Sequence, residues 1–182
     1  IISAPHIFDS VKPLFETNPD LIFDGELYAD KFANDFNKIV SLVKKTKPTA
    51  DDLKESKELI EYHIYDLPSS DKNFIQRAYD LAILFETRSE LHPHCRIVET
   101  YKVPSEDVVT ELYEKYVEEG YEGQMLRLDG KYENKRSKNL MKHKSFVDEE
   151  YIIKDIVEGE GNRTGTAGYF VFETEEGKTF KS

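Results

Sequence analysis

Tyr121-Glu122-Gly123-Gln124-Met125-Leu126-Arg127 is the most informative stretch of this 182-residue sequence. It places an acid, a glycine and an arginine at or beside a predicted strand, residues 124–128. The next predicted strand carries Lys142 and Lys144, which share one face because they are two residues apart. Carboxylate, glycine and paired lysines are the groups needed to hold a nucleotide's phosphates and a metal ion. An exposed pair of strand lysines with no ligand is the alternative interpretation.

The charge of the chain is unevenly distributed. The formal net charge is −11, which by itself argues against a polyanionic partner. Residues 131–144, however, hold six Lys or Arg and one acidic residue, a local charge of +5. A local basic patch can bind phosphates while the whole protein stays acidic. A solvated basic segment on an acidic surface remains the alternative.

The bulk composition is that of a folded domain. Hydrophobic residues make up 38% and aromatic residues 12% of the chain, enough to build a core. No apolar run approaches the length of a membrane span, so we expect no membrane partner. No signal-peptide pattern is found at the start. The single cysteine, Cys95, excludes an internal disulfide framework and fits a reducing cytoplasm.

Hydrophobic periodicity predicts alternating strands and helices up to residue 147. Predicted strands cover residues 21–28, 59–67, 96–103, 124–128 and 139–144. Predicted helices cover residues 30–45, 71–91 and 105–119, with Asp30 and Ser105 as N-caps and Gly120 at the end of the third. Asp129-Gly130 is typical of a hairpin turn.

The pattern changes from residue 148 onward. Residues 151–157, 169–174 and those after 179 are predicted strands with no helix between them. Short strands joined by glycine-rich loops favour the start of a small barrel. We therefore expect two domains, residues 1–147 and 148–182.

Two further motifs lie on predicted strands. Asp24-Gly25-Glu26 puts an acid beside a glycine, where a carboxylate can bind a ribose hydroxyl or a magnesium ion; such a triplet is also common in turns. Tyr65 lies opposite the core face of its strand, where an aromatic ring can stack on a base. Ordinary packing is the alternative for Tyr65.

The order of these pieces resembles the ATP-dependent DNA ligases, with small ligases of bacteriophage type the most similar. The resemblance is carried by Asp24-Gly25-Glu26-Leu27-Tyr28, Tyr62-His63-Ile64-Tyr65-Asp66, the stretch 121–127 and residues 136–144, in this order. The segments 148–151 and 158–161 look like the entry to the oligonucleotide-binding barrel of that family. The resemblance implies an α+β fold: a nucleotidyltransferase (adenylation) domain of mostly antiparallel sheets with flanking helices, followed by the start of an OB-fold β-barrel.

The resemblance also implies roles for individual residues. Tyr65 matches the aromatic that stacks on adenine, and Lys142 and Lys144 match the lysines that contact the ATP phosphates. Glu26 matches an acid that contacts the nucleotide or its metal, and Glu122 matches a metal-binding acid. Arg136 and Lys138 lie in the basic segment expected to contact nucleic acid.

The implied activity is the sealing of nicks in duplex DNA, with ATP and Mg²⁺ as cofactors. In this family a lysine amine attacks the α-phosphate of ATP, the AMP then moves to the 5′-phosphate of a nick, and the 3′-hydroxyl displaces it. We expect a monomer that acts in DNA replication, repair or recombination in a bacterial or phage-infected cytoplasm.

The attacking lysine of the family belongs to a Lys-x-Asp-Gly motif that these 182 residues do not contain. We therefore expect the chain to be an internal section of a ligase that does not form the lysyl-adenylate by itself. An RNA ligase or a capping-type guanylyltransferase is the alternative within the superfamily. A non-catalytic nucleic-acid-binding module and an acidic interaction domain are the alternatives outside it.

Overall fold

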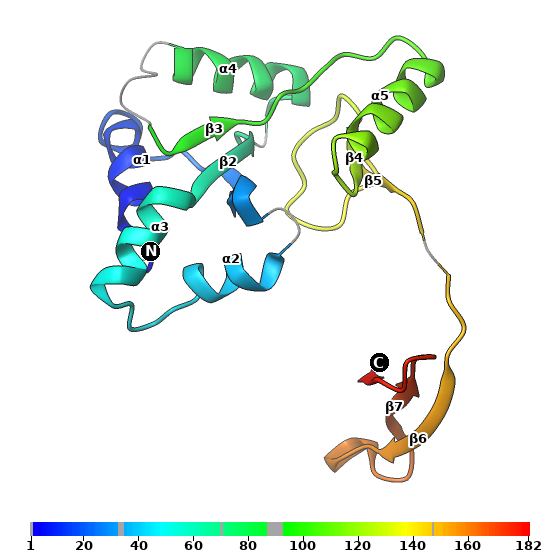
Figure 1. Cartoon of the computed structure of the whole chain (residues 1–182). Coiled ribbons are helices and arrows are strands. Elements are labelled where there is room, and N and C mark those ends of the chain that lie inside the picture. Colours follow the sequence, from blue (N-terminus) through cyan, green and yellow to red (C-terminus); the bar gives the residue numbers. More distant parts are fainter. Residues whose placement is uncertain (1, 33–34, 70, 87–92, 147) are drawn as a thin grey trace. The chain divides into compact units, whose positions relative to one another are not determined.

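The computed structural model describes residues 2–32, 35–69, 71–86, 93–146 and 148–182. The chain divides into two compact units, Ile1–Lys144 and Ser145–Ser182. The predicted α+β class is confirmed: mostly antiparallel sheets are flanked by helices (Figure 1). Within the described ranges, no helix has the length and apolar character needed to span a membrane.

The first unit contains most of the regular structure. Its helices are α1 (Pro5–Thr17), the 3₁₀ turn η1 (Asp30–Phe32), α2 (Phe36–Val43), α3 (Ala50–Leu59), α4 (Phe74–Glu86) and α5 (Glu106–Glu118). Its strands are β1 (Asp24–Tyr28), β2 (Glu61–Asp66), β3 (Cys95–Ile97), β4 (Gly123–Arg127) and β5 (Leu140–Lys144).

The sheet β1-β2-β3 has a buried face and a polar face. β2 pairs antiparallel with β1 and parallel with β3. Ile64 of β2 is fully buried, and it packs with Leu14 of α1 and Leu81 of α4 in the main hydrophobic cluster. Helix α4 lies along β2 and β3 (Figure 1). The prediction that Ile64 faces the core while its neighbours in the strand face away is confirmed.

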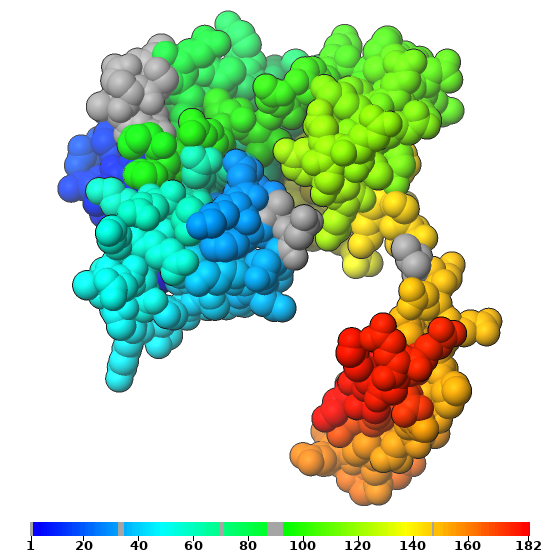
Figure 2. All heavy atoms as spheres, in the orientation of Figure 1, coloured from blue at the N-terminus to red at the C-terminus, as the bar shows by residue number. Residues whose placement is uncertain are grey.

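The hairpin β4–β5 is covered by a helix on one side only. Gln124 of β4 donates a hydrogen bond to the Val109 carbonyl of α5 at 2.7 Å, and His143 of β5 stacks on Tyr113 of α5 at 4.3 Å between ring centroids. Figure 2 shows α5 and the hairpin packed side by side. Because β-strand side chains alternate, Lys142 and Lys144 lie on the face away from α5.

The second unit is a small antiparallel sheet. It consists of β6 (Ile152–Glu158), the 3₁₀ turn η3 (Gly161–Arg163), β7 (Ala167–Glu173) and β8 (Thr179–Lys181), in the order β6-β7-β8. Tyr151, Phe172 and Phe180 form an aromatic cluster, with 4.8 Å between the rings of Tyr151 and Phe180. Whether this sheet is the start of an OB-fold barrel stays a prediction.

Several predicted boundaries are wrong for identifiable reasons. Asp30 begins only a 3₁₀ turn; the cap of α2 is Asp35, whose carboxylate accepts from the Lys38 amide at 3.0 Å. Phe36 therefore starts a helix instead of lying within one, and 65% of its surface is exposed. The strand predicted at 96–103 ends at Ile97, because beyond it Val98 makes a single backbone bond to β2.

Other boundaries agree or fall outside the described residues. Ser105 accepts from the Val108 amide as the cap of α5, and Gly120 has a left-handed φ of 92° after its end, as predicted. The predicted end of the helix at 71–91 lies within residues 87–92, outside the described ranges. Asp129-Gly130 does not form a tight hairpin turn, because residues 128–139 separate β4 from β5.

Candidate functional site

The polar face of the β1–β2 pair carries two predicted site residues. Glu26 is directly opposite His63 in the antiparallel register, and such pairs point to the same side of a sheet. Tyr65 is two residues from His63, so it shares that face. Glu26 is exposed and Tyr65 is half-buried. The structure therefore brings these two side chains to one surface.

The Tyr65 phenol lies in an acidic environment. Burial raises the pKa of the Tyr65 hydroxyl above its ordinary value, and the carboxylates of Asp24 and Glu26 raise it further. The phenol consequently stays neutral at physiological pH. A neutral, half-buried ring beside a polar surface is suited to stacking.

The lysine pair lies on the free face of the β4–β5 hairpin. The carboxylate of Glu122, whose side chain is 74% exposed, is 3.0 Å from the Lys142 ammonium and 3.8 Å from the Lys144 ammonium. The Lys142 hydrogen bond and the charges of both lysines lower the pKa of Glu122. The two ammonium groups thus share one anionic group, and that group is a carboxylate of the same hairpin.

Arg127 joins the two surfaces. Arg127 lies on the same face of β4 as Met125, and Met125 pairs with Lys142 of β5. The guanidinium carbon of Arg127 is 5.9 Å from the centre of the Tyr65 ring. The guanidinium also lies 4.8 Å from the Phe74 ring of α4. The face that bears the lysines and the face that bears Tyr65 therefore meet at Arg127.

A buried carboxylate anchors this junction. Asp66, at the end of β2, is fully buried and accepts from Nε and Nη2 of Arg77 at 2.8 and 3.0 Å. The same carboxylate accepts from Arg127 and from the Leu67 amide. Such two-point guanidinium–carboxylate contacts fix geometry as well as charge. Asp66 thus ties β2, α4 and β4 together.

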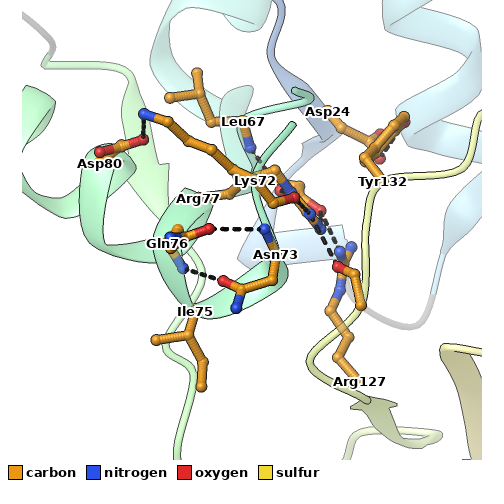
Figure 3. A network of polar contacts seen from close by, with 12 residues as sticks. Asp24, Leu67, Lys72, Asn73, Ile75, Gln76, Arg77, Asp80, Arg127 and Tyr132 are labelled. Atoms are coloured by element: carbon orange, nitrogen blue, oxygen red, sulfur yellow. Dashed lines mark hydrogen bonds and ion pairs between the residues drawn. The ribbon is translucent and has the colours of Figure 1, made fainter. Parts of the chain in front are cut away.

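The long β4–β5 connection is held to the same region. Asp129 accepts from the Ile75 amide at 3.0 Å and from the Asn73 side chain at 3.1 Å, at the start of α4. The Gly130 carbonyl accepts from Arg77 at 3.1 Å, and the Tyr132 hydroxyl donates to Asp24 at 3.0 Å. Figure 3 shows Tyr132 and Asp24 beside the guanidinium groups. These contacts position the basic loop beside the sheet.

The loop borders an open pocket of about 310 Å³ against the sheet and α4. Asp24, Phe74, Arg77 and Arg127 line one part of it, and Lys131 to Lys135 line another. Glu26, Tyr65, Glu122, Lys142 and Lys144 are not among the lining residues. The predicted residues thus lie outside this pocket, and Arg127, which lines it, lies 5.9 Å from the Tyr65 ring.

The predicted nucleic-acid residues occupy the exposed part of this loop. Arg136 and Lys138 are both exposed in the connection between β4 and β5. Neither takes part in an ion pair within the described residues, so both charges are open to an anionic partner. Nothing in their placement distinguishes nucleic acid from another polyanion.

The acids fit a magnesium ion by their chemistry. Mg²⁺ is commonly bound by one or two carboxylates together with substrate phosphates, and Glu26 and Glu122 offer such oxygens. Among the described residues, no three His, Cys, Asp or Glu side chains cluster as a ready-made metal site. A metal role for Glu26 and Glu122 stays a prediction.

The prediction from sequence missed Asp66, Arg77 and Arg127 as a group. Asp66 continues the buried side of β2 after Ile64, and Arg77 lies on the buried side of α4, where it is 2% exposed. A charged residue at a core position of each of two neighbouring elements indicates a buried ion pair, because an unpaired buried charge is costly. That signal was present in the sequence.

Comparison with known proteins identifies the family. The model of the ATP-dependent DNA ligase domain matches residues 2–144. The chain belongs to this family. Over 83 residues it is 39% identical to the DNA ligase of Enterobacteria phage T4, and over 88 residues it is 34% identical to that of African swine fever virus. These matches cover 45% and 46% of this chain, and 17% and 21% of the two relatives.

A solved structure supports the same assignment. A structure from a study of Lig E DNA ligases, described as DNA binding with a minimal scaffold, is 28% identical with a TM-score of 0.73. The match covers 87% of this ligase-family chain and 60% of that chain. The chain therefore spans only part of the relatives it matches.

Proposed function

We propose that this chain supplies the nucleotide-binding surfaces of an ATP-dependent DNA ligase that seals nicks in duplex DNA. The observation that carries the proposal is the meeting of two surfaces at Arg127. One bears an aromatic ring and a carboxylate, Tyr65 and Glu26, and the other bears Lys142, Lys144 and Glu122. Base, phosphates and metal each have a chemically matched partner in this set.

Each residue has a distinct role in the proposal. Tyr65 stacks on adenine, and Glu26 contacts the ribose or the metal. Lys142 and Lys144 bind the phosphates, and in doing so they exchange the Glu122 carboxylate for the ATP oxygens. Glu122 is then free to bind the metal. The ion pairs with Glu122 hold both lysines on one face before the nucleotide arrives.

The chemistry consists of phosphoryl transfers through enzyme-adenylate and DNA-adenylate intermediates. Such transfers depend mostly on positioning and charge neutralisation. Bound Mg²⁺ supplies positive charge against the phosphates. Lys142 and Lys144 orient the phosphate chain, while Tyr65 fixes the other end of the nucleotide.

The remaining parts are assigned to DNA. Arg136 and Lys138 contact the backbone of nicked duplex DNA, and residues 148–182 form the first strands of an OB-fold that follows the adenylation domain at 1–147. We propose that the protein acts as a monomer.

The assay compares nick sealing on duplex DNA with the joining of single-stranded RNA, in the full-length protein. We expect sealing of DNA only, and a loss of about a hundredfold for Lys142→Ala and for Glu122→Ala. Lys115→Ala is the control, because Lys115 is exposed on α5 and its one ion pair among the described residues is with Glu119. Joining of RNA alone would favour the RNA-ligase alternative, and wild-type activity in both site variants would remove the assignments.

A second measurement separates base from DNA contacts. Tyr65→Ala is expected to weaken ATP binding by more than tenfold, since base stacking contributes roughly 1–3 kcal/mol, and to leave DNA binding nearly unchanged. An equal loss of both would indicate a role in folding.

A further inference from the structure

The side chain of Arg127 has more partners than charge pairing requires. It is 15% exposed and lies between two aromatic rings, Phe74 at 4.8 Å and Tyr65 at 5.9 Å. A guanidinium within about 6 Å of a ring centre is attracted by the negative charge of the ring face. Arg127 also donates to the buried Asp66 carboxylate.

Asp66 does not depend on Arg127 for neutralisation. Arg77 already pairs with both oxygens of Asp66 at 2.8 and 3.0 Å, and the Leu67 amide donates a third hydrogen bond at 2.8 Å. Arg127 is thus a second cation on a carboxylate that is already satisfied. Its loss would leave no buried charge without a partner.

The Tyr65 ring is half-buried, and the Arg127 guanidinium carbon lies 5.9 Å from its centre. Its strand neighbour Asp66 fixes the guanidinium, and the guanidinium in turn lies against the Tyr65 ring. A side chain held in its bound orientation before the ligand arrives costs less to order on binding.

We propose that Arg127 is a positioning residue for Tyr65: held by Asp66, it fixes the orientation of the ring on which the base stacks. This inference rests on the proposed function, in which Tyr65 binds adenine. Arg127 acts on the base end of the nucleotide, while Lys142 and Lys144 act on its phosphates.

The test measures binding of AMP, ATP and inorganic tripolyphosphate to the full chain by calorimetry. Arg127→Met is expected to weaken AMP and ATP binding about tenfold each, which corresponds to about 1.4 kcal/mol, and to leave tripolyphosphate binding unchanged. Arg127→Lys, which keeps a cation but loses the planar group, is expected to recover only part of the loss.

Two further variants are compared with Arg127→Met. Lys115→Met is the control, because Lys115 is exposed on α5 outside the proposed site, and it is expected to change none of the three affinities. Arg77→Met is expected to lower the melting temperature, because it removes the main partner of Asp66 and leaves the Gly130 carbonyl unpaired. Arg127→Met is expected to lower the melting temperature less than Arg77→Met does, because Asp66 keeps both of its hydrogen bonds to Arg77.

Three outcomes would overturn the inference while leaving the proposed function standing. The first is unchanged AMP binding in Arg127→Met. The second is an equal loss of tripolyphosphate binding in that variant, which would place Arg127 on the phosphates. The third is a fall in the melting temperature of Arg127→Met as large as that of Arg77→Met. A wild-type chain that binds no ATP, or a Tyr65→Ala chain that binds AMP as tightly as wild type, would overturn the proposed function and the inference together.

Discussion

Gly123 shows how a single residue limits the geometry of the site. Its φ is +150°, and a Cβ atom built on it would lie 2.2 Å from the His143 carbonyl oxygen and 3.0 Å from the Lys144 Cα. Only glycine adopts such a backbone conformation at low cost. The absence of a side chain at Gly123 therefore lets β5, with its two lysines, approach the residue after Glu122.

Gly123→Ala is predicted to destabilise the first unit by about 3 kcal/mol or more, since strain and a backbone clash add. Urea unfolding followed by circular dichroism measures the loss. Gly120→Ala is the control: its φ is +92° with no atom within 4 Å of the added Cβ, so only the cost of a left-handed alanine, roughly 1 kcal/mol, is expected. Equal losses in the two variants would contradict the close approach.

Cys95 provides a second prediction at this scale. The thiol is 6% exposed, and burial raises the pKa of Cys95 from 9.0 to about 11, with the Glu61 charge adding to the rise. Because the thiolate is the reactive form, this rise lowers the reactive fraction at neutral pH about a hundredfold.

We expect Cys95 to react with a disulfide reagent at pH 8 only after unfolding. The rate in the native chain should rise with pH up to about 11, since deprotonation of a group with a raised pKa occurs later in the titration. Rapid labelling of the native chain at pH 8, at the rate seen in denaturant, would contradict the burial.

Helix α4 is fixed at its start by a residue far away in sequence. Asp129 accepts from the Ile75 amide, in the first turn of the helix, and from the side chain of Asn73 just before it. First-turn amides of a helix have no intrahelical partner, and a carboxylate there also interacts favourably with the helix dipole. The loop between β4 and β5 thus completes the first turn of a helix whose Ile75 lies 54 residues earlier in the chain.

Asp129→Ala is therefore predicted to lower stability by about 1 kcal/mol, the usual effect of losing a helix cap. Thermal unfolding measures the change. The control Asp51→Ala removes an exposed acid from the first turn of α3 that makes no capping hydrogen bond, so a loss of at most about 0.5 kcal/mol is expected. If both variants lose the same free energy of unfolding, the hydrogen bonds of Asp129 add nothing to stability beyond the interaction of its charge with the helix.

Across the whole molecule, charge is segregated. The chain carries −11 overall, while the connection between β4 and β5 exposes Lys131, Lys135, Arg136 and Lys138. An acidic protein can bind DNA only where such a patch overcomes the general repulsion. Binding to duplex DNA should therefore be strongly salt-dependent.

Arg136→Ala and Lys138→Ala are each predicted to reduce the slope of log K against log salt by about 0.9, the value for one phosphate contact on duplex DNA. Titration of nicked duplex DNA at several salt concentrations gives the slopes. Lys115→Ala, on the exposed side of α5, should leave the slope unchanged. Unaltered slopes in the two loop variants would exclude this loop as the DNA contact.

Much of the local structure follows from the sequence because its causes are local. Alternation predicted which face of β2 is buried, and Ser105 and Gly120 predicted the ends of α5, since capping involves atoms only a few residues apart. Asp129-Gly130 shows the limit of such rules. The pair is typical of a hairpin, yet Asp129 makes its contacts with α4, because distant donors compete with the local turn.

The sequence by itself predicted the α+β class, the succession of strands along the chain and the family; the residues expected to bind the nucleotide stay a prediction. Only the tertiary structure decided how these residues come together. Asp66 and Arg127 are 61 positions apart, and no local pattern predicts that they share a hydrogen bond. The reason is physical: short-range periodicity selects the face of each element, whereas long-range pairing of buried charges decides which faces meet.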